Sequence, residues 1–246
     1  MVSYVTDPNL PCGKVNTVIA DADDCLINTL RCFGISVIKT QSCKTLPFFE
    51  QRHADMQCIH LGNNRIIIAK GCEYLILPLS NLGFDVITAD CELKEAYPEN
   101  VLLNGCIAGD KLICNPSTLS KCVLSLYDEN KIIKTKQGYS KCSVAVVSYN
   151  AVITADEGIF KVCTDNKIDC LKIKPGYIKL EGVNYGFIGG CSGKLGKDIL
   201  CFNGDLSTHP NYEDIKSFTR NYGVYTENLG QYELYDIGGI LPVLEE

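Results

Sequence analysis

The chain alternates short apolar runs with segments whose apolar residues recur at helical spacing. Five apolar runs each lead directly into such a helical segment. Pro, Asp, Ser or Thr precedes the helical segments, as expected at a helix start, and Gly or Asn near their ends gives way to a second apolar run. The pattern therefore predicts the order strand, helix, strand five times. The five first runs begin at Thr17, Arg65, Lys111, Ala151 and Asp198.

A third strand is predicted to complete each unit, so the chain reads as five repeats of one plan. The positions Val18, Ile67, Leu112, Val152 and Ile199 recur at intervals of 40 to 49 residues. This regularity predicts an α/β fold with pseudo-fivefold repeats. We expect a single domain over 1–246, with repeat units over 17–64, 65–110, 111–150, 151–197 and 198–246.

The third strands carry short polar side chains in one column when they are aligned on their first large apolar residue. A surface column would also contain Lys and Glu, and a core column would be aliphatic. The pattern predicts an enclosed, hydrated environment that all five units share. In a ring of five units, that environment is the axis. The column consists of Asp55, Asn100, Ser143, Asn184 and Asp236.

The two ends of the repeat region are predicted to pair. The first strand, "TVIADAD" from Thr17, has no hairpin partner in its own unit, and the last segment, "GGILPVLEE", has no strand after it. Pairing them would cover two exposed sheet edges, as β-propellers do. The first and last units would then share one blade of a closed five-bladed propeller.

Composition narrows the function classes. A net charge of −6 leaves no basic stripe to neutralise phosphates, so neither nucleic acid nor an anionic membrane surface is an expected partner. The N-terminal residues have no basic segment followed by an apolar one, and no apolar run approaches the 18 or more residues of a membrane span. We expect a soluble, cytoplasmic protein, and its oligomeric state stays open.

Fifteen cysteines and three histidines raise the question of disulfides and metals. The odd count and the length of the chain favour reduced thiols over a disulfide scaffold. No C-x-x-C pair occurs, and His53, His60 and His209 form no ligand spacing, so we expect no metal site. His60 and His209 fall in predicted turns and are expected to be solvated.

The segment "IGGCSGKLGK" from Ile188 resembles a phosphate-binding loop at first sight. In the only register that ends in Gly-Lys, Cys191 replaces the first Gly of the motif and Asp198 replaces its Ser or Thr. We therefore expect a hairpin turn and no cofactor. Gly189 and Gly190, inside a predicted strand, indicate a bend or the close approach of another group.

Four segments, "RHADMQ", "LLNGCIAGDKLICNP", "YGFIGGCSGKLG" and "LYDIGG", resemble the pentein superfamily. Penteins are five-bladed α/β propellers that include arginine deiminases, amidinotransferases and dimethylarginine hydrolases. The resemblance covers residues 12–246 and is closest to an uncharacterised subgroup from anaerobic bacteria. It implies a bacterial protein with the fold of the enzymes that modify guanidino groups.

The resemblance also implies a mechanism. In catalytic penteins a cysteine attacks the guanidinium carbon, a histidine moves protons, and carboxylates hold the cation. His53-Ala-Asp55 resembles the family's H-x-D element, which as a strand would place both side chains on one face. The family's histidine usually lies in a middle blade, and its nucleophile follows a Gly-Gly near the C-terminus. Here the segment from Asp236 through Gly238 and Gly239 contains no cysteine.

Three thiols remain as candidate nucleophiles. Cys191 follows a Gly-Gly in the fourth unit and is the first candidate, ahead of Cys142, beside Ser143, and Cys106. A buried cysteine can equally serve as a small apolar side chain. For the two carboxylates at the axis, Asp55 and Asp236, the alternative to ligand binding is a hydrogen-bonding role between blades.

The expected ligand is a small cationic molecule of the guanidino or amidino type, bound at the axis. Catalysis as a cysteine-dependent hydrolase or amidinotransferase, with His53 as acid and base and Cys191 as nucleophile, stays open. The alternative is a catalytically inactive pentein that acts as a ligand-binding or protein-docking module. The expected ligand-binding residues are Asp55, Asn100, Ser143, Asn184 and Asp236.

Overall fold

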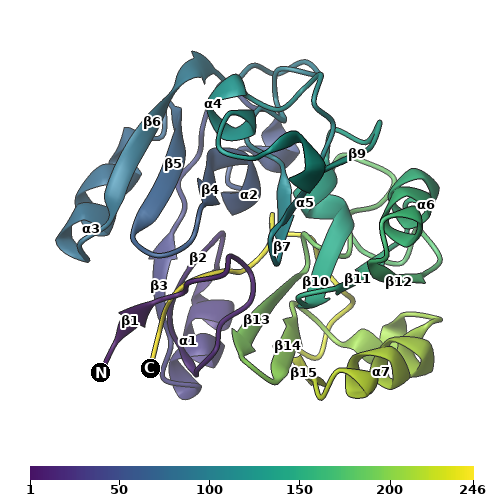
Figure 1. Ribbon diagram of the computed structural model, residues 1–246. Helices are drawn as coiled ribbons and strands as arrows, with labels where there is room; N and C mark the ends of the chain where they lie inside the picture. Colours follow the sequence, from purple (N-terminus) through teal and green to yellow (C-terminus); the bar gives the residue numbers. More distant parts are fainter.

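The structure is a computed structural model that describes residues 1–246. Five small sheets, with helices α3, α6 and α7 toward the periphery, make up a mixed α/β fold (Figure 1). In every sheet two strands are parallel and a third is antiparallel to the first of them. The sheets thus fit a fivefold repeat. Their strand orders are β1-β16-β2-β3, β4-β5-β6, β7-β8-β9, β10-β11-β12 and β13-β14-β15.

The parallel strands are those that the sequence predicts, and these predictions are confirmed. The first strand of each pair is mostly apolar and buried because both of its faces are covered, as in β5, where the four central residues are all buried. The second strand of each pair is more exposed than the first. The pairs are β2 (Val15–Ala20) with β3 (Ser36–Lys39), β5 (Arg65–Lys70) with β6 (Asp85–Glu92), β8 (Lys111–Cys114) with β9 (Ile132–Lys134), β11 (Ala151–Thr154) with β12 (Asp169–Lys172), and β14 (Ile199–Phe202) with β15 (Tyr225–Asn228).

Each parallel pair is joined by a helical connection, as predicted. Asp23 and Asp156 cap α1 and α6 by accepting hydrogen bonds from the amides of Leu26 and Ile159. Helices α1, α3 and α7 are followed by glycines with positive φ, as at Gly34 (φ 78°), so the chain reverses there without strain. The connecting helices are α1 (Asp24–Cys32), α3 (Ile76–Asn81), α4 (Lys121–Leu124), α6 (Glu157–Asp165) and α7 (Tyr212–Asn221), with 3₁₀ turns Glu73–Leu75, Glu129–Lys131 and Leu206–Thr208.

The third strand of each repeat pairs with the first strand of the following repeat. Strand β4, for example, pairs antiparallel with β5, and the register joins Cys58 to Ile68. Four of these third strands lie side by side, because β10 contacts β7 and β13, and β13 contacts β16. They are β4 (Cys58–His60), β7 (Cys106–Ala108), β10 (Val144–Ser148), β13 (Ser192–Gly196) and β16 (Leu241–Glu245).

The predicted pairing of the two ends is confirmed. Strand β16 runs antiparallel to β2, with Leu241 opposite Ile19, and the N-terminal strand β1 (Ser3–Tyr4) adds to the outer edge of β16. Both ends of the chain therefore lie in one sheet, where Figure 1 places the two termini close together. No helix of the structure combines the length and the apolar character that a membrane crossing requires.

The expectation that His53 and Asp55 lie on one strand is wrong. Residues Ala54–Gln57 form a single helical turn, α2, directly before β4, and His53 occupies the N-cap position of this turn. The amide of Asp55 donates to the carbonyl of Gly238 instead of to a neighbouring strand in a ladder. A similar turn, α5 (Ser140–Ser143), precedes β10, and a 3₁₀ turn covers Phe48–Glu50.

Candidate functional site

Two carboxylates, Asp55 and Asp236, lie buried where the segments that precede the third strands of the repeats meet. We call these third strands the inner strands. The Nδ1 atom of His53 lies 3.9 Å from Oδ1 of Asp236, and both side chains are almost fully enclosed. Asp236 is held in place by backbone donors, because Oδ2 accepts from the amide of Phe187 at 2.8 Å and Oδ1 from the amide of Gly238 at 2.9 Å. We call His53, Asp55, Asn104, Cys142 and Asp236 the central cluster.

Asp55 has an unusual hydrogen-bonding state. Its Oδ2 accepts from the thiol of Cys142 at 3.0 Å, whereas its Oδ1 is buried without a partner. Burial is the main reason that the pKa of Asp55 is raised to about 6; the nearby charge of Asp236 acts in the same direction, and the charges of His53 and Lys141 oppose the shift. The site therefore favours the protonated form of this carboxyl more than water does.

Asn104 connects the parts of the central cluster, and sequence reasoning missed it. Its side-chain amide donates to the carbonyl of Asp55 and lies 3.1 Å from the sulfur of Cys142. Its Oδ1 accepts from the amides of Lys141 and Cys142. The residue belongs to the "LLNGC" segment, which carries part of the pentein resemblance and in which Cys106 is the only predicted site residue. Asn104 is buried in the second repeat unit, and its side chain bonds to Asp55 of the first unit and to Lys141 and Cys142 of the third. It therefore holds segments of three repeat units together.

A second buried network surrounds Glu50. The side-chain amide of Asn100 donates to Oε2 of Glu50 at 3.0 Å and lies 2.5 Å from the hydroxyl of Tyr139. Burial raises the pKa of Glu50, and hydrogen bonds from Asn100 and Tyr139 oppose that shift. The ring of Tyr139 stacks on Phe187, with centroids 5.8 Å apart. Glu50 was not predicted, because a lone Glu in "LPFFE" carries no motif.

The polar column of the sequence alignment does not occupy one structural position. Asp55 lies three residues before its inner strand, Asn100 six residues before β7, and Ser143 directly before β10. The turns before the strands differ in length, so an alignment on apolar residues mixes positions. Asp55, Asn100, Ser143 and Asp236 are all buried, but Asn184 is exposed.

Ser143 belongs to a different part of the site from the carboxylates. Its hydroxyl is buried without a hydrogen-bond partner, and it borders a cavity of about 190 Å³ that also touches Gly186 and Phe187. Asn184 does not reach this cavity or the central cluster. The structure thus brings together Asp55 and Asp236 with His53, places Asn100 and Ser143 at its sides, and leaves Asn184 on the surface.

The candidate thiols are enclosed and protonated. Burial raises the pKa of both Cys191 and Cys142 well above the usual range, and nearby carboxylates raise it further. The thiol of Cys191 donates to the carbonyl of Ile188, and that of Cys142 to Asp55. Burial raises the pKa of Cys106 to about 12. None of the three forms a hydrogen bond with a histidine, the general base that commonly activates a nucleophilic cysteine.

The expectation that His60 and His209 are solvated is wrong. Both rings are buried, with Nε2 of His60 bonded to the carbonyl of Asn63 and Nε2 of His209 to that of Lys174. Burial lowers the pKa of His60 to about 4 and also lowers that of His209. Their turns are covered by other segments, which local sequence does not reveal.

The two Gly-Gly pairs make room for the central cluster. A Cβ atom at Gly238 would lie 2.3 Å from Cβ of His53, and one at Gly189 would meet the carbonyl of Lys141 at 2.3 Å. The close approach expected at Gly189 and Gly190 is therefore confirmed, but both glycines lie in a turn before β13 and not inside a strand as predicted. The expected hairpin is shorter than predicted, because Ser192–Gly196 is strand β13 and only residues 197 and 198 form the turn.

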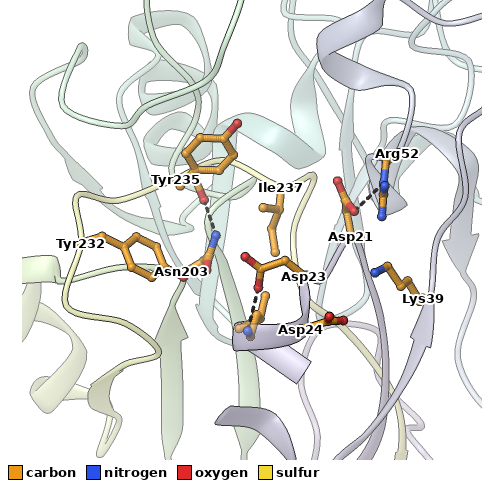
Figure 2. Close-up of a pocket in the computed structure, with 10 residues that line it drawn as sticks. Asp21, Asp23, Asp24, Lys39, Arg52, Asn203, Tyr232, Tyr235 and Ile237 are labelled. Atoms are coloured by element: carbon orange, nitrogen blue, oxygen red, sulfur yellow. Dashed lines mark hydrogen bonds and ion pairs between the residues drawn. The ribbon is translucent and has the colours of Figure 1, made fainter. Parts of the chain in front are cut away.

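A cavity of about 600 Å³ opens beside the central cluster (Figure 2). Tyr232, Tyr235 and Asn203 lie on one side of it, and Asp21 with Arg52 on the other. Arg52 directly precedes His53, and Ile237 directly follows Asp236, so the cavity wall continues into the cluster. The full lining is Asp21, Asp23, Asp24, Leu26, Lys39, Arg52, Asn203, Tyr232, Tyr235 and Ile237.

Three carboxylates enter this cavity from the end of β2 and the start of α1. Nε of Arg52 donates to Oδ1 of Asp21 at 2.8 Å, Asp23 caps α1, and Asp24 forms no ion pair. Burial raises the pKa of Asp21, and the charges of Arg52 and His53 oppose that shift. In the sequence these carboxylates appear as the run "ADADD", where the first predicted strand ends and which alone does not indicate a cavity.

Comparison with known proteins identifies a family. The profile described as "Family of unknown function (DUF6873)" matches residues 17–241. A search of curated proteins finds no match to the sequence. The structural matches cover most of the chain.

Three solved structures illustrate the fold. SxtG, an amidinotransferase from Microseira wollei in the saxitoxin biosynthetic pathway, has a TM-score of 0.56 at 10% identity, covering 92% of this chain and 91% of that one. The inosamine-phosphate amidinotransferase of Streptomyces griseus has a TM-score of 0.55 at 11% identity, covering 94% and 91%. A cysteine-to-serine mutant of DDAH from Pseudomonas aeruginosa, in complex with citrulline, has a TM-score of 0.53 at 10% identity, covering 87% and 92%. All three are pentein superfamily members. The chain therefore belongs to the family of unknown function DUF6873, and its fold is that of the pentein superfamily.

Proposed function

We propose that this protein binds a small organic cation of the guanidino or amidino class in the cavity of Figure 2, and that it does so without a cysteine nucleophile. The observation that carries the proposal is the group of three carboxylates, Asp21, Asp23 and Asp24, at one wall of a cavity of about 600 Å³ beside the central cluster. Carboxylates accept the planar guanidinium group through charge-assisted hydrogen bonds.

The Asp21–Arg52 pair supports the choice of ligand chemistry. This pair shows that a guanidinium group fits against Asp21 at the cavity wall, and it occupies only Oδ1 of that carboxylate. Asp24 forms no ion pair, and it leaves a carboxylate for a ligand. Tyr232 and Tyr235 on the facing wall offer aromatic rings, which attract organic cations.

The fold supports the same class. Known pentein structures include two amidinotransferases and a DDAH mutant with citrulline bound. We infer that the five sheets close into one five-bladed α/β propeller over 1–246, with the repeat units given above. The pairing of β16 with β2 and the contacts among β7, β10, β13 and β16 support this closure.

The state of the thiols favours binding over cysteine chemistry. Cys142 and Cys191 are buried and have raised pKa values, and their thiols donate hydrogen bonds to oxygen atoms. A thiolate would have to form in an enclosed site beside carboxylates, which disfavours it. Fifteen free thiols, three of them exposed, also support a reducing, cytoplasmic location as part of this proposal.

A cysteine-dependent hydrolase or amidinotransferase is the second candidate. The observation that favours it is the His53–Asp236 pair, since a carboxylate beside a buried histidine orients the ring for proton transfer. This candidate requires a conformational change that exposes one thiol to a bound ligand.

The test is a thermal-shift and calorimetric titration with arginine, agmatine, creatine and methylated arginines. Citrulline, which replaces the cationic guanidino group by a neutral ureido group, is the matched ligand control. We expect at least one guanidino compound to raise the Tm, because a ligand that binds only the native state stabilises it. If no cationic compound raises the Tm of the folded protein even at high concentration, the proposal is overturned.

Variants locate the site. Asp21→Asn and Asp24→Asn should weaken binding about tenfold or more, whereas Asp165→Asn, an exposed carboxylate on α6, should leave it unchanged. Asp23→Asn also removes a charge, but it keeps the cap of α1 because Asn caps helices as well as Asp does. Product analysis by mass spectrometry distinguishes binding from turnover.

A further inference from the structure

Two half-buried cysteines, one on a strand and one on a helix, share one hydroxyl group. Cys91 lies on β6 and Cys122 on α4, and both sulfur atoms contact Oγ of Ser120. The thiol of Cys91 donates to this oxygen at 3.4 Å, and the sulfur of Cys122 lies 3.0 Å from it. The two sulfur atoms are therefore no more than 6.4 Å apart, the sum of these two distances.

We propose that Cys91 and Cys122 form a reversible disulfide, and that this pair is a site of oxidative modification. A disulfide bond is about 2.05 Å long and needs Cβ atoms roughly 4 Å apart. Formation of the bond requires one or both side chains to rotate to another staggered χ1 well, so that the sulfur atoms meet beside the hydroxyl. Because Ser120 now lies between them, its side chain turns aside when the bond forms.

The local backbone brings the two thiols together. The register between β5 and β6 shifts after Thr88, so that Lys70 pairs with Glu92 and β6 bulges around Cys91. Bulges redirect side chains at sheet edges. On the other side, Ser120 is the N-cap residue of α4, and its amide donates to the carbonyl of Leu102 at 2.8 Å.

Accessibility and a shared hydroxyl group together separate this pair from the other thiols. Nine of the fifteen cysteines are buried, and Cys12, Cys25 and Cys32 are exposed. Cys91 and Cys122 are both half-buried, so neither residue is enclosed in the core. No other pair of solvent-accessible cysteines is joined through a common hydrogen-bond partner.

The chemistry balances with a peroxide as the oxidant. The thiolate of one cysteine attacks a peroxide oxygen, the O–O bond breaks, and a sulfenic acid and one water (for hydrogen peroxide) form. The second thiolate then attacks the sulfenic sulfur, the S–S bond forms, and the S–O bond breaks with release of a second water. Two electrons pass from the two thiols to the peroxide.

The crosslink closes a loop that reaches the central cluster. Residues 92–121 lie between the two cysteines, and they include Asn100, which bonds to Glu50, and Asn104, which bonds to Asp55 and Cys142. Oxidation at the surface therefore restrains the segment that carries both asparagines. This consequence does not depend on which ligand the protein binds.

The experiment uses the full chain with Cys12, Cys25 and Cys32 changed to serine, so that exposed thiols do not link molecules. The folded protein is treated with equimolar hydrogen peroxide, alkylated, and digested with trypsin and Asp-N without reductant. These enzymes release Cys91 in peptide 90–94 and Cys122 in peptide 122–127, each with no other cysteine. We expect these two peptides linked, with the mass of the chain reduced by about two hydrogen atoms.

Two variants complete the test. In Cys122→Ser, the linked peptide should disappear and dimedone should trap a sulfenic acid at Cys91, whereas Cys170→Ser, the matched control at another half-buried thiol, should still yield the linked peptide. Near-unchanged Tm values establish that both variants fold. Linkage that appears only in urea, or links through other cysteines in preference, would overturn the proposal.

Discussion

A Cβ atom at Gly190 would lie 1.9 Å from Oδ1 of Asp236. The second glycine of the fourth unit thus allows a buried carboxylate of the fifth unit to reach its two backbone donors. A glycine at 190 is consequently a packing requirement of the central cluster, and it explains the Gly-Gly that the sequence analysis connected with Cys191.

We predict that Gly190→Ala destabilises the protein by about 1 to 3 kcal/mol, because either Asp236 or the turn must move. Urea unfolding measures the change. Gly196→Ala is the matched control, since a Cβ there would meet no atom closer than 3.7 Å, and it should change stability by less than about 0.5 kcal/mol. Equal effects of the two substitutions would contradict the described packing.

Asn104→Ala should cost about 2 to 4 kcal/mol. The substitution leaves the carbonyl of Asp55 and the amides of Lys141 and Cys142 with fewer partners in an enclosed site. The same urea measurement on Asn184→Ala, which removes an exposed amide, should give a change near zero. The reverse ranking would place Asn184 in the cluster in the manner expected from the sequence.

Asp55 should make the protein less stable as pH rises from about 4 to about 6. Its pKa is raised to about 6 in the folded state from an ordinary value of 3.8, so in this window the folded state holds the proton more firmly than the unfolded state. The stability of the wild type relative to Asp55→Asn should therefore fall across this window, on the order of 2 to 3 kcal/mol.

His60 acts in the opposite direction over nearly the same window. Burial lowers its pKa to about 4, so its contribution is complete above about pH 6.5 and is lost as pH falls toward 4. The difference between wild type and Asp55→Asn, measured by urea unfolding at several pH values, cancels this contribution. A difference that rises with pH would contradict the raised pKa of Asp55.

Thiol labelling tests the assignment of the cysteines. With limiting reagent near neutral pH, Cys12, Cys25 and Cys32 should react first, and Cys142 and Cys191 should react only as fast as the protein unfolds. Mass spectrometry of peptides identifies each site. A single fast cysteine in the central cluster, slowed by His53→Ala, would instead support the cysteine-dependent enzyme.

The sequence predicted the repeating elements because their signals are local. The apolar run of β5 and the cap at Asp156 are visible without knowledge of the fold. The turns before the inner strands are not, since "RHADMQ" has no helical period long enough to distinguish one turn from a strand. The predicted common face for His53 and Asp55 failed for that reason.

The candidate site was only partly predictable, because its geometry depends on contacts between repeats. Asp55 and Asp236 carry a polar signal inside apolar segments, which sequence analysis can detect. Glu50 and Asn104 become important only when distant turns bring their partners to them. The cavity carboxylates were visible as a charged run, but their placement beside His53 required the arrangement of the sheets.

The strand exchange between successive repeats has a consequence for unfolding. No sheet consists of a single repeat, because β4 completes the sheet of β5, and β16 completes that of β2. Linear repeat arrays can unravel from an end, since each repeat contacts only its neighbours. Here the last repeat supplies a strand to the first, so neither end is free to fray, and the loss of one sheet disrupts the next. We expect one cooperative transition that involves the whole chain.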